Sequence, residues 1–470
     1  MKLERSILRF SDNALLKSES GQVFKYGDLL ACVSKLRSLL KPRTLVFCLA
    51  NNSIGSIAGY LALMEAQAVP LLLDASTDSA LLQSLVDRYK PNYLWRPKAN
   101  IDAGDECASV IYTLGDYELV TCFSEPVPLH PELGLLLSTS GSMGSAKLVR
   151  LSQKNVWANA ASIAEYLKLN EDERPITSLP AHYSYGLSVI NSHVHVGATI
   201  LVTNASVMQR EFWDFAKTQS ATSISGVPYT YEMLSRLRFF SMNLPDLRTL
   251  TQAGGRLSQA RIADFLKYAQ QQQKSFVVMY GQTEATARMS YLPTEWAQEK
   301  LGSVGVAIPG GEFFLLNDAG EHITEFDVTG NLYYRGPNVS MGYAECAEDL
   351  LLGDVRGGVL DTGDLASRDA DGFYFIQGRK SRFAKVFGNR VGLDEVENLV
   401  KLLVSDCACI GEDDLIRVFV TEDGLQESVR SLLVEKTGLN RRAFEVRVIS
   451  VIPKNTSGKI QYARLKELLQ

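Results

Sequence analysis

The 470-residue sequence predicts an α/β fold, with a large N-terminal domain of helix-covered, mostly parallel sheets that includes a small antiparallel β subdomain, followed by a small α+β C-terminal domain. Two observations predict it. Short apolar runs alternate with segments of helical periodicity up to about Gly302, and alternation with a period of two residues follows that point. Buried strands that alternate with helices are typical of parallel sheets covered on their faces.

The first part of the chain repeats a strand–helix rhythm. "TLVFCLA" is a short apolar strand, "SIGSIAGYLALMEAQ" has helical periodicity, and "AVPLLLDAS" is a second strand that ends in a polar loop. The same order returns in "ATILVTNA", "WDFAKTQSATSISGVP" and "SFVVMYGQTEAT". The polar "QQQQK" before the last of these segments reads as the end of a helix.

After Gly302 the pattern is typical of antiparallel strands. Turn dipeptides occur at Asn317-Asp318 and Asp371-Gly372, between runs of alternating polarity. We place the β subdomain at about 302–378 and a domain boundary at Gly378 to Ser381, which gives an N-terminal domain of 1–378 and a C-terminal domain of 379–470. Two helices are expected in the C-terminal domain, over Leu393–Val404 and Leu425–Thr437.

Bulk composition excludes several classes of protein. A formal net charge of −5 argues against broad nucleic-acid binding, which needs a basic face. The seven scattered cysteines suggest reduced, intracellular thiols, and Cys407 and Cys409 are read as alternating residues of a buried strand rather than metal ligands. The longest apolar window, 185–203, contains Asn191, His193 and His195, so no transmembrane segment is expected. The N-terminus lacks a signal-peptide core, and a cytoplasmic protein is expected.

The segment "LLLSTSGSMGSAKLVRLS" contains a loop suited to an anion. It is not a Walker-type loop, because Gly141 and Gly144 enclose only two residues and Lys147 precedes a leucine. Hydroxyl groups and flexible glycines can nevertheless turn several donors toward phosphate oxygens, and Lys147 adds a charge. A flexible surface connection is the alternative reading of the same loop.

The segment "VVMYGQTEAT" delivers polar residues to the carboxyl end of a strand, where ligands bind in open α/β sheets. Tyr280 offers a flat face for a base, and Glu284 offers hard oxygens for Mg²⁺. The alternative reading is a Tyr-Gly turn followed by a helix N-terminus, with Thr283 as the cap and Glu284 favouring the helix dipole.

Two further segments contain candidate binding groups. Asp364, in an expected Thr-Gly-Asp turn, can accept hydrogen bonds from both hydroxyls of a ribose, and Arg379 closes the following strand. Lys459 follows a polar, glycine-containing turn near the C-terminus. Taken alone, the first pair reads equally well as a hairpin with a surface ion pair, and the lysine as an ordinary solvated side chain.

Together, these segments resemble the adenylate-forming superfamily, which includes acyl- and aryl-CoA synthetases, peptide-synthetase adenylation domains and firefly luciferase. The resemblance spans nearly the whole chain. Departures occur in the phosphate loop, where Ala146 and Leu148 stand in place of the usual Pro and Gly. The matching segments, in family order, are STSGSMGSAKLV, SLPAHYSYGLS, AGGRL, MYGQTE, GSVGVAIPG, YYRGPNVSMGY, DTGD, GR and PKNTSGK.

The resemblance implies a role for each candidate residue. Lys459, Thr283, Glu284 and His182 are the expected catalytic residues, with Glu284 also the Mg²⁺ ligand. Lys459 is expected to enter the site with a mobile C-terminal domain during adenylation. His182, Tyr185 and Gly254 are expected to bind the acid. The expected ATP-binding residues are Thr139, Ser140, Gly141, Ser142, Met143, Gly144, Lys147, Gly255, Tyr280, Gly281, Asp364 and Arg379.

The resemblance also implies a second half-reaction, in which the C-terminal domain rotates about a hinge to admit a pantetheine thiol. Lys385 and Gly388 resemble the thiolation face, and the acidic helix start matches at Glu395 and Glu397. Ser381 stands where the hinge is commonly Asp or Lys, and Leu393 replaces a common Pro. These departures bear on the acceptor more than on adenylation.

The sequence therefore predicts an AMP-forming ligase that uses ATP and Mg²⁺ to activate a small carboxylic acid and passes it to CoA or to a separate phosphopantetheine carrier protein. No acidic residue follows the aromatic positions near His182, so an uncharged acyl or aryl acid is favoured over an amino acid. Tyr185 and Tyr229 are open to a second reading, as packing residues. Amide or ester transfer to an amine or sugar, and a non-catalytic nucleotide-binding homologue, are the alternatives.

Overall fold

The structure is a computed structural model that describes residues 7–98, 109–123, 125–138, 147–380, 382–386, 389–412, 414–454 and 460–468. The chain packs into two compact units. The first comprises residues 1–301, 305–312 and 335–360, and the second comprises 302–304, 313–334 and 361–470. The boundary expected at 378–381 falls within the second unit and stays a prediction.

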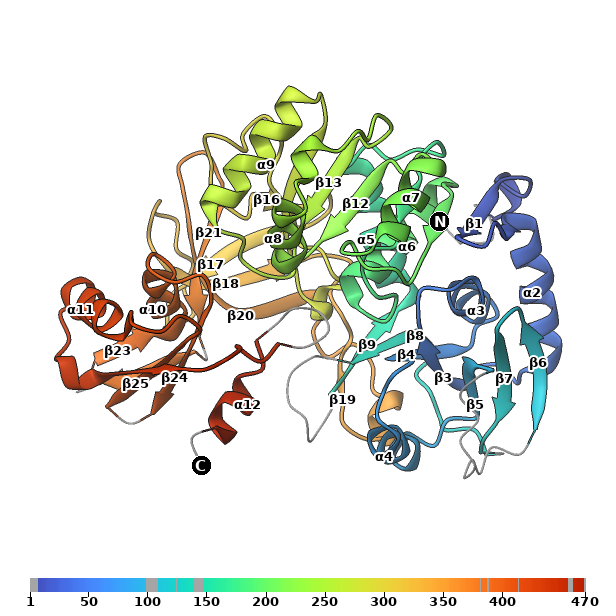
Figure 1. Ribbon diagram of the computed structural model, residues 1–470. Helices are drawn as coiled ribbons and strands as arrows, with labels where there is room; N and C mark the ends of the chain where they lie inside the picture. Colours follow the sequence, from blue (N-terminus) through green and yellow to red (C-terminus); the bar gives the residue numbers. More distant parts are fainter. Residues whose placement is uncertain are drawn as a thin grey trace. The chain divides into compact units, whose positions relative to one another are not determined.

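An eight-stranded sheet forms one half of the first unit, in the order β19-β9-β8-β4-β3-β5-β7-β6 (Figure 1). Its central pairs, β3–β4, β3–β5 and β4–β8, are parallel as predicted. Every residue of β3 is buried, which explains its continuous apolar sequence. The strands are β3 (Leu45–Ala50), β4 (Val69–Asp74), β5 (Tyr93–Pro97), β6 (Val110–Leu114), β7 (Tyr117–Thr121), β8 (Leu133–Ser138), β9 (Leu148–Ser152) and β19 (Gly342–Ala344). Helix α2 (Tyr26–Leu39) precedes β3, and α3 (Ile54–Glu65) and α4 (Ser79–Tyr89) follow β3 and β4.

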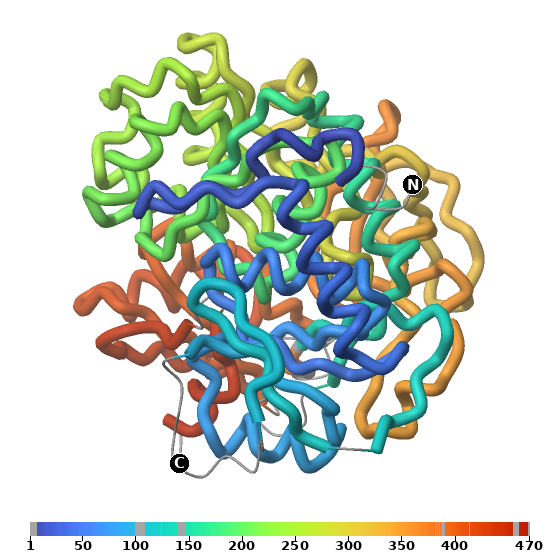
Figure 2. The backbone as a smooth tube through the Cα atoms, turned by 90° about the vertical axis from the view of Figure 1, so that its right-hand side faces the viewer, coloured from blue at the N-terminus to red at the C-terminus, as the bar shows by residue number. Residues whose placement is uncertain are grey.

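A nine-stranded sheet forms the other half, in the order β16-β15-β14-β13-β12-β10-β11-β1-β2. The first strand of the chain, β1, lies parallel to β11, so the blue N-terminal segment runs beside the green middle of the chain in Figure 2. Helix α8 packs on β12 (Figure 1), and α9 packs on β14. The strands are β1 (Ala14–Ser18), β2 (Val23–Lys25), β10 (Pro175–Ile176), β11 (Ile200–Val202), β12 (Ser223–Gly226), β13 (Thr249–Gln252), β14 (Ser275–Tyr280), β15 (Ser290–Tyr291) and β16 (Val306–Ala307).

Capping interactions mark the ends of two helices in this half. Helix α5 starts with a capping box between Ser152 and Asn155, and α6 ends at Gly197, whose φ of 82° suits a left-handed cap. Helix α6 carries both His193 and His195, as expected for polar residues of a globular helix. The helices are α5 (Gln153–Tyr166), α6 (Ser184–Val196), α7 (Arg210–Thr218), α8 (Pro228–Arg236) and α9 (Gln259–Gln271). Within the described part of the chain, no helix has the length and apolar character needed to cross a membrane.

The second unit contains the antiparallel four-stranded sheet β17-β18-β20-β21. The expected turn at Thr362–Asp364 is wrong, because these residues lie inside β20. Gly363 has a φ of 70°, and this irregular residue is accommodated within the strand rather than reversing it. The elements are β17 (Glu312–Leu316), β18 (Gly330–Arg335), β20 (Val359–Arg368) and β21 (Tyr374–Arg379).

The C-terminal part is α+β, as predicted. Helix α10 ends at Val400, four residues before the predicted end, because Leu402 and Leu403 donate hydrogen bonds back three residues and tighten the chain into turns. Cys407 and Cys409 are buried on one strand, as expected. The elements are β22 (Phe383–Val386), β23 (Asn389–Gly392), α10 (Leu393–Val400), β24 (Cys407–Glu412), β25 (Leu415–Val420), α11 (Gln426–Thr437), β26 (Phe444–Val448) and α12 (Tyr462–Glu467).

Candidate active site

The carboxyl end of β14 begins the candidate site. Tyr280 is the last residue of the strand, and a single 3₁₀ turn, η2 (Thr283–Ala285), follows it. The alternative of an α-helix capped by Thr283 is wrong, since Gln282 holds the cap position and no side chain caps the turn. The hydroxyl of Thr283 lies instead 3.0 Å from the Ser184 hydroxyl, which joins η2 to the start of α6.

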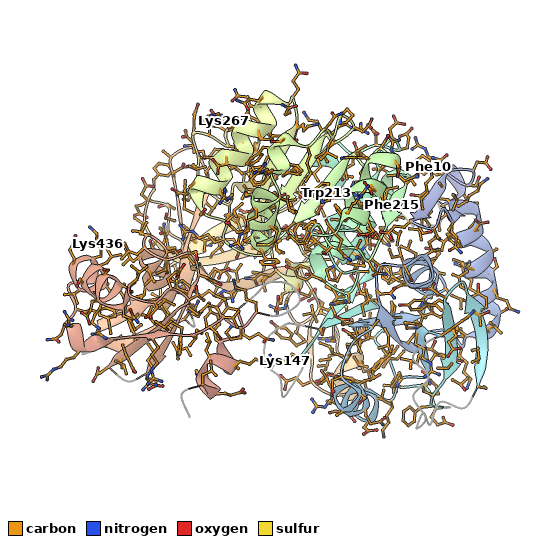
Figure 3. All side chains as sticks on the ribbon, in the orientation of Figure 1. Phe10, Lys147, Trp213, Phe215, Lys267 and Lys436 are labelled. Carbon is orange, nitrogen blue, oxygen red and sulfur yellow. The ribbon has the colours of Figure 1, made fainter. Side chains whose placement is uncertain are left out.

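Glu284 is linked to Lys147 through Tyr343. The Tyr343 hydroxyl donates a 2.7 Å hydrogen bond to Glu284 Oε1, and the Lys147 ammonium lies 5.8 Å from the centre of the tyrosine ring. Lys147 also forms a 2.8 Å ion pair with Glu345 (Figure 3 labels Lys147). Burial, and then the Glu284 carboxylate, raise the pKa of Tyr343 to about 12, so its hydroxyl stays a donor.

His182 lies at the carboxyl end of β4. Its Nε2 is 3.5 Å from Oδ2 of Asp74, the last residue of β4. Burial lowers the pKa of His182, and the Asp74 carboxylate opposes this only in part. A neutral imidazole beside the carboxyl edge of the sheet can accept or donate a hydrogen bond to a bound acid without adding charge.

The glycines of the site are held by close packing. At Gly281 an added Cβ would lie 1.6 Å from the Ala287 carbonyl oxygen, so no larger residue fits. Gly254 has a φ of 82°, and its added Cβ would lie 2.6 Å from the Tyr183 hydroxyl. At Gly255 an added Cβ would be tight against Pro228, at 3.1 Å. At these three positions a side chain would therefore meet neighbouring atoms, which favours glycine.

Tyr185 is almost completely buried, and its hydroxyl donates a 2.9 Å hydrogen bond to the Thr251 carbonyl. The Arg288 guanidinium lies 5.0 Å above its ring. Tyr229, in contrast, is exposed. Tyr185 thus has a packing role, and its predicted contact with the acid stays a prediction.

Asp364 and Arg379 meet in the second unit, as neighbours across β20 and β21. Arg379 Nε lies 3.4 Å from Asp364 Oδ1, and Arg379 is the last residue of its strand, as predicted. The Asp364 carboxylate is buried while the arginine side chain is mostly exposed. This arrangement leaves the guanidinium accessible to a phosphate or sugar.

Several predicted residues lie outside the described part of the chain. They are Thr139, Ser140, Gly141, Ser142, Met143, Gly144, Ser381, Gly388 and Lys459.

The carboxylate of Glu284 fits a Mg²⁺ ion that is bound together with a nucleotide. Glu284 keeps a second carboxylate oxygen beyond the one that Tyr343 contacts. Mg²⁺ is usually held by one or two carboxylates plus substrate phosphates rather than by an all-protein cage. Within the described ranges, no group of three or more His, Cys, Asp or Glu side chains forms such a cage.

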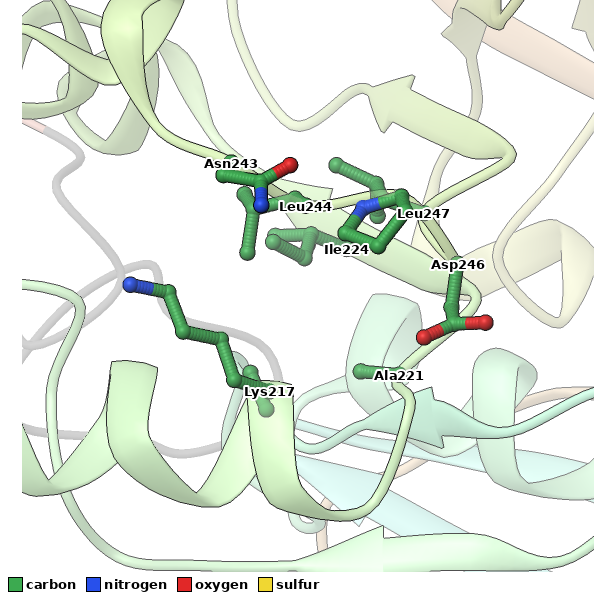
Figure 4. A pocket seen from close by; sticks show the side chains of 9 residues that line it. Lys217, Ala221, Ile224, Asn243, Leu244, Asp246 and Leu247 are labelled. Atoms are coloured by element: carbon green, nitrogen blue, oxygen red, sulfur yellow. The ribbon is translucent and has the colours of Figure 1, made fainter.

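A cavity of about 210 Å³ lies apart from these residues, between α7, β12 and the segment after η1 (Phe239–Ser241) (Figure 4). Lys217 and Asp246 flank an apolar floor that includes Ile224. None of the predicted site residues lines it.

Sequence reasoning missed three residues that contact the predicted ones: Asp74, Tyr343 and Glu345. Asp74 ends a strand that the sequence did identify, which places it at the edge of the sheet where ligands bind. Tyr343 closes the segment "YYRGPNVSMGY", already used for the resemblance. Glu345 carried no signal, because its role depends on the pairing of β19 with β9.

Two helix-covered sheets, with the Thr283–Glu284 turn after β14 and Lys147 before β9, form an arrangement suited to the chemistry of an AMP-forming ligase. The chain belongs to the AMP-binding enzyme family, whose model matches residues 3–344. The predicted resemblance and fold class are confirmed.

Curated relatives are similar over most of the chain. The indoleacetate–CoA ligase of Aromatoleum aromaticum is 26% identical, over 94% of this chain and 93% of its own length. The 2-succinylbenzoate–CoA ligase of Listeria innocua is 25% identical, over 71% and 69%. The long-chain-fatty-acid–CoA ligase of Yersinia pestis is 28% identical, over 73% and 63%.

Solved structures share the fold. The o-succinylbenzoate CoA synthetase (MenE) of Bacillus subtilis, in complex with the acyl-adenylate intermediate OSB-AMP, superposes with a TM-score of 0.82 at 19% identity, over 99% of this chain and 97% of that chain. ATP-bound MatB from Rhodopseudomonas palustris gives a TM-score of 0.78 at 19% identity, over 100% and 99%. The MenE enzyme has also been solved with ATP and a magnesium ion, the cofactors that the sequence predicts here.

Proposed function

We propose that this enzyme activates a small carboxylic acid with ATP and Mg²⁺ and then transfers the acyl group to the thiol of CoA or of a separate phosphopantetheine carrier protein. The observation that supports it most directly is the line of contacts at the sheet edge. Ser184 meets Thr283, Glu284 meets Tyr343, and the Tyr343 ring lies under Lys147. Four segments distant in sequence thus bring hydroxyl, carboxylate and ammonium groups to one place.

The first half-reaction joins two anions. A carboxylate oxygen attacks the α-phosphorus of ATP, the bond from that phosphorus to the bridging oxygen breaks, and acyl-AMP and pyrophosphate form. Charge repulsion contributes to the barrier, so cations around the phosphates lower it. Lys147 binds the phosphates, Glu284 holds Mg²⁺, and the Thr283 hydroxyl donates to the α-phosphate.

Magnesium, when bound at Glu284, neutralises phosphate charge and orients the leaving pyrophosphate. Tyr343 fixes the Glu284 carboxylate through Oε1. In the second unit, Asp364 and Arg379 hold the ribose. Lys459 is proposed to bridge the carboxylate and phosphate oxygens during this half-reaction.

In the second half-reaction, the thiol sulfur attacks the acyl carbonyl carbon, AMP leaves, and the thiol proton passes to solvent. Every curated relative named above is a CoA ligase, which supports a thiol acceptor. His182, neutral and beside Asp74, contacts the acid near its reacting carboxylate.

The test is acid-dependent pyrophosphate exchange with ATP, followed by release of AMP on addition of CoA or a phosphopantetheinylated carrier. Wild-type enzyme is expected to exchange pyrophosphate with at least one acid. Lys459→Ala is expected to lose nearly all exchange, by a factor of about a hundred or more, while keeping its unfolding curve. Exchange at the wild-type rate in that variant would overturn the assigned role of Lys459.

A further inference from the structure

Arg288 is a buried arginine without a carboxylate partner among the described residues. Arg288 is only 2% exposed and stands four positions after Glu284 in the chain. Burying a charge is strongly unfavourable unless it is paired, and buried arginines in proteins usually face a carboxylate. Two other arginines of this unit are buried. Arg96 lies 3.0 Å from Glu118, and Arg150 donates from Nε, Nη1 and Nη2 to backbone carbonyls.

The partners of the Arg288 guanidinium are neutral. Nε donates to the Ser188 hydroxyl at 3.1 Å, and Nη1 donates to the Tyr166 hydroxyl and to the Met279 sulfur, both at 3.1 Å. A guanidinium has five N–H groups, and these contacts use three. No described residue accepts a hydrogen bond from Nη2, and the thioether is a weak acceptor that a better one can replace.

Arg288 lies beside an apolar cluster that contains Tyr185, one of the residues expected to bind the acid. Its guanidinium lies over the ring of Tyr185, which packs with Met279, Val227 and Ala253 in one cluster. Tyr183 packs against the same cluster. Its hydroxyl lies next to Gly254, one of the residues predicted to bind the acid.

The neighbouring histidine of α6 adds no second positive charge. Burial, together with the nearby charge of Arg288, lowers the pKa of His193 to about 4. At neutral pH, the His193 ring is therefore uncharged, and Arg288 supplies the positive charge of this region.

We propose that the acid activated by this enzyme carries a second carboxylate, which binds Arg288 while the first one reacts with ATP. The substrate class is then a dicarboxylic acid with an apolar body lying along Tyr183 and Tyr185. The inference rests on the proposed function and replaces the sequence-based preference for an uncharged acid. Arginine recognises carboxylates through paired N–H groups, which makes it selective for this chemistry.

The competing explanation is a purely structural arginine. Arg288 does connect α5, α6 and β14 through Tyr166, Ser188 and Met279, and its carbonyl accepts hydrogen bonds from Asn159 and Asn338. A structural role predicts that removing the guanidinium lowers stability and lowers activity toward every acid by the same factor.

The experiment measures acid-dependent pyrophosphate exchange for pairs of acids with the same carbon skeleton, one dicarboxylic and one monocarboxylic, in aliphatic and aromatic series. Wild-type enzyme is expected to prefer a dicarboxylic member by at least about tenfold in kcat/KM, because the monocarboxylic member lacks the charged group that pairs with Arg288. Arg288→Met should abolish that preference with the KM for ATP unchanged. Arg288→Lys should keep part of it.

Arg96→Met is the matched control, because it removes a buried arginine from a structural ion pair and should leave the acid preference intact. The proposal is overturned if wild-type enzyme prefers monocarboxylic acids, or if Arg288→Met lowers exchange equally for both members of a pair. The wild-type panel decides this even if Arg288→Met does not fold. Absence of exchange with every acid would instead overturn the proposed function.

Discussion

The Tyr343 hydroxyl donates a 2.7 Å hydrogen bond to Glu284, a residue 59 positions earlier in the chain. The same ring faces two cations, Lys147 at 5.8 Å and Arg356 at 4.9 Å. Tyr343 therefore connects the expected Mg²⁺ ligand with the expected phosphate-binding lysine. Its position follows from the pairing of β19 with β9, opposite Val149.

Tyr343→Phe should raise the Mg²⁺ concentration needed for half-maximal pyrophosphate exchange. The variant keeps the ring but loses the hydrogen bond that orients Glu284, an effect of about 1 kcal/mol or roughly fivefold. Titration of Mg²⁺ at saturating ATP measures it. Tyr26→Phe removes a hydroxyl that donates to the Ala198 carbonyl and should leave the Mg²⁺ dependence unchanged. Identical Mg²⁺ curves for all three proteins would refute the positioning role.

Glu345→Gln should lower the KM for ATP modestly. Glu345 and Lys147 are both about half exposed, so their ion pair is worth no more than about 1 kcal/mol, or roughly a fivefold change. Removing the Glu345 charge takes away one competitor of phosphate for the Lys147 ammonium, whereas Lys147→Gln should raise the KM for ATP. Steady-state kinetics at low and high salt test this, since screening should shrink the Glu345→Gln effect. A higher KM in Glu345→Gln would contradict it.

Arg382→Ala should destabilise the C-terminal part of the chain. Arg382 pairs with Asp394 and, at 2.8 Å, with the buried Glu397, and it donates a 2.8 Å hydrogen bond to the Tyr462 hydroxyl. Removing it leaves buried carboxylate charge unpaired, which costs about 3–5 kcal/mol. Hydrogen exchange of β24 amides reports this loss.

The matched control for that change is Arg417→Ala. Arg417 also pairs with two carboxylates, Glu412 and Glu445, but these are partly exposed to solvent. Its removal should cost less than about 1 kcal/mol. Equal protection of β24 amides in both variants would show that burial of Glu397 does not determine the effect.

Acidification should destabilise the first unit through His193. The folded-state pKa is lowered to about 4, below the usual 6.5, so between these values the unfolded chain binds a proton that the native state does not. Stability is therefore lost as pH falls, by about 2 kcal/mol from pH 7 to pH 5. Urea unfolding at both pH values should show a smaller change in His193→Gln. The exposed His322→Gln should behave like wild type.

The sequence predicted the sheets well because buried strands and amphipathic helices have distinct periods. Thr362–Asp364 was misread because glycine-containing polar triplets are usual in turns, whereas here Gly363 is held inside a strand. The α-helix expected after Tyr280 is a 3₁₀ turn, since Thr283 hydrogen-bonds to Ser184 rather than capping. Tertiary contact decided both cases.

The candidate site was only partly predictable. Glu284 and Lys147 stand in recognisable segments, but Tyr343 and Glu345 reach them only through strand pairing. Arg288 appears in the sequence as an ordinary basic residue. That it is buried with neutral partners becomes visible only when α5, α6 and β14 are packed together.

The pairing of β19 with β9 has a consequence for the permitted length of the chain. Asn338 is anchored by hydrogen bonds to the carbonyls of Ala285 and Arg288, and Tyr343 is fixed opposite Val149. Because successive strand residues face opposite sides, a one-residue insertion or deletion between these two anchors would turn the tyrosine away from Glu284. Homologous chains that keep this tyrosine–carboxylate contact should therefore differ here by substitution and not by length.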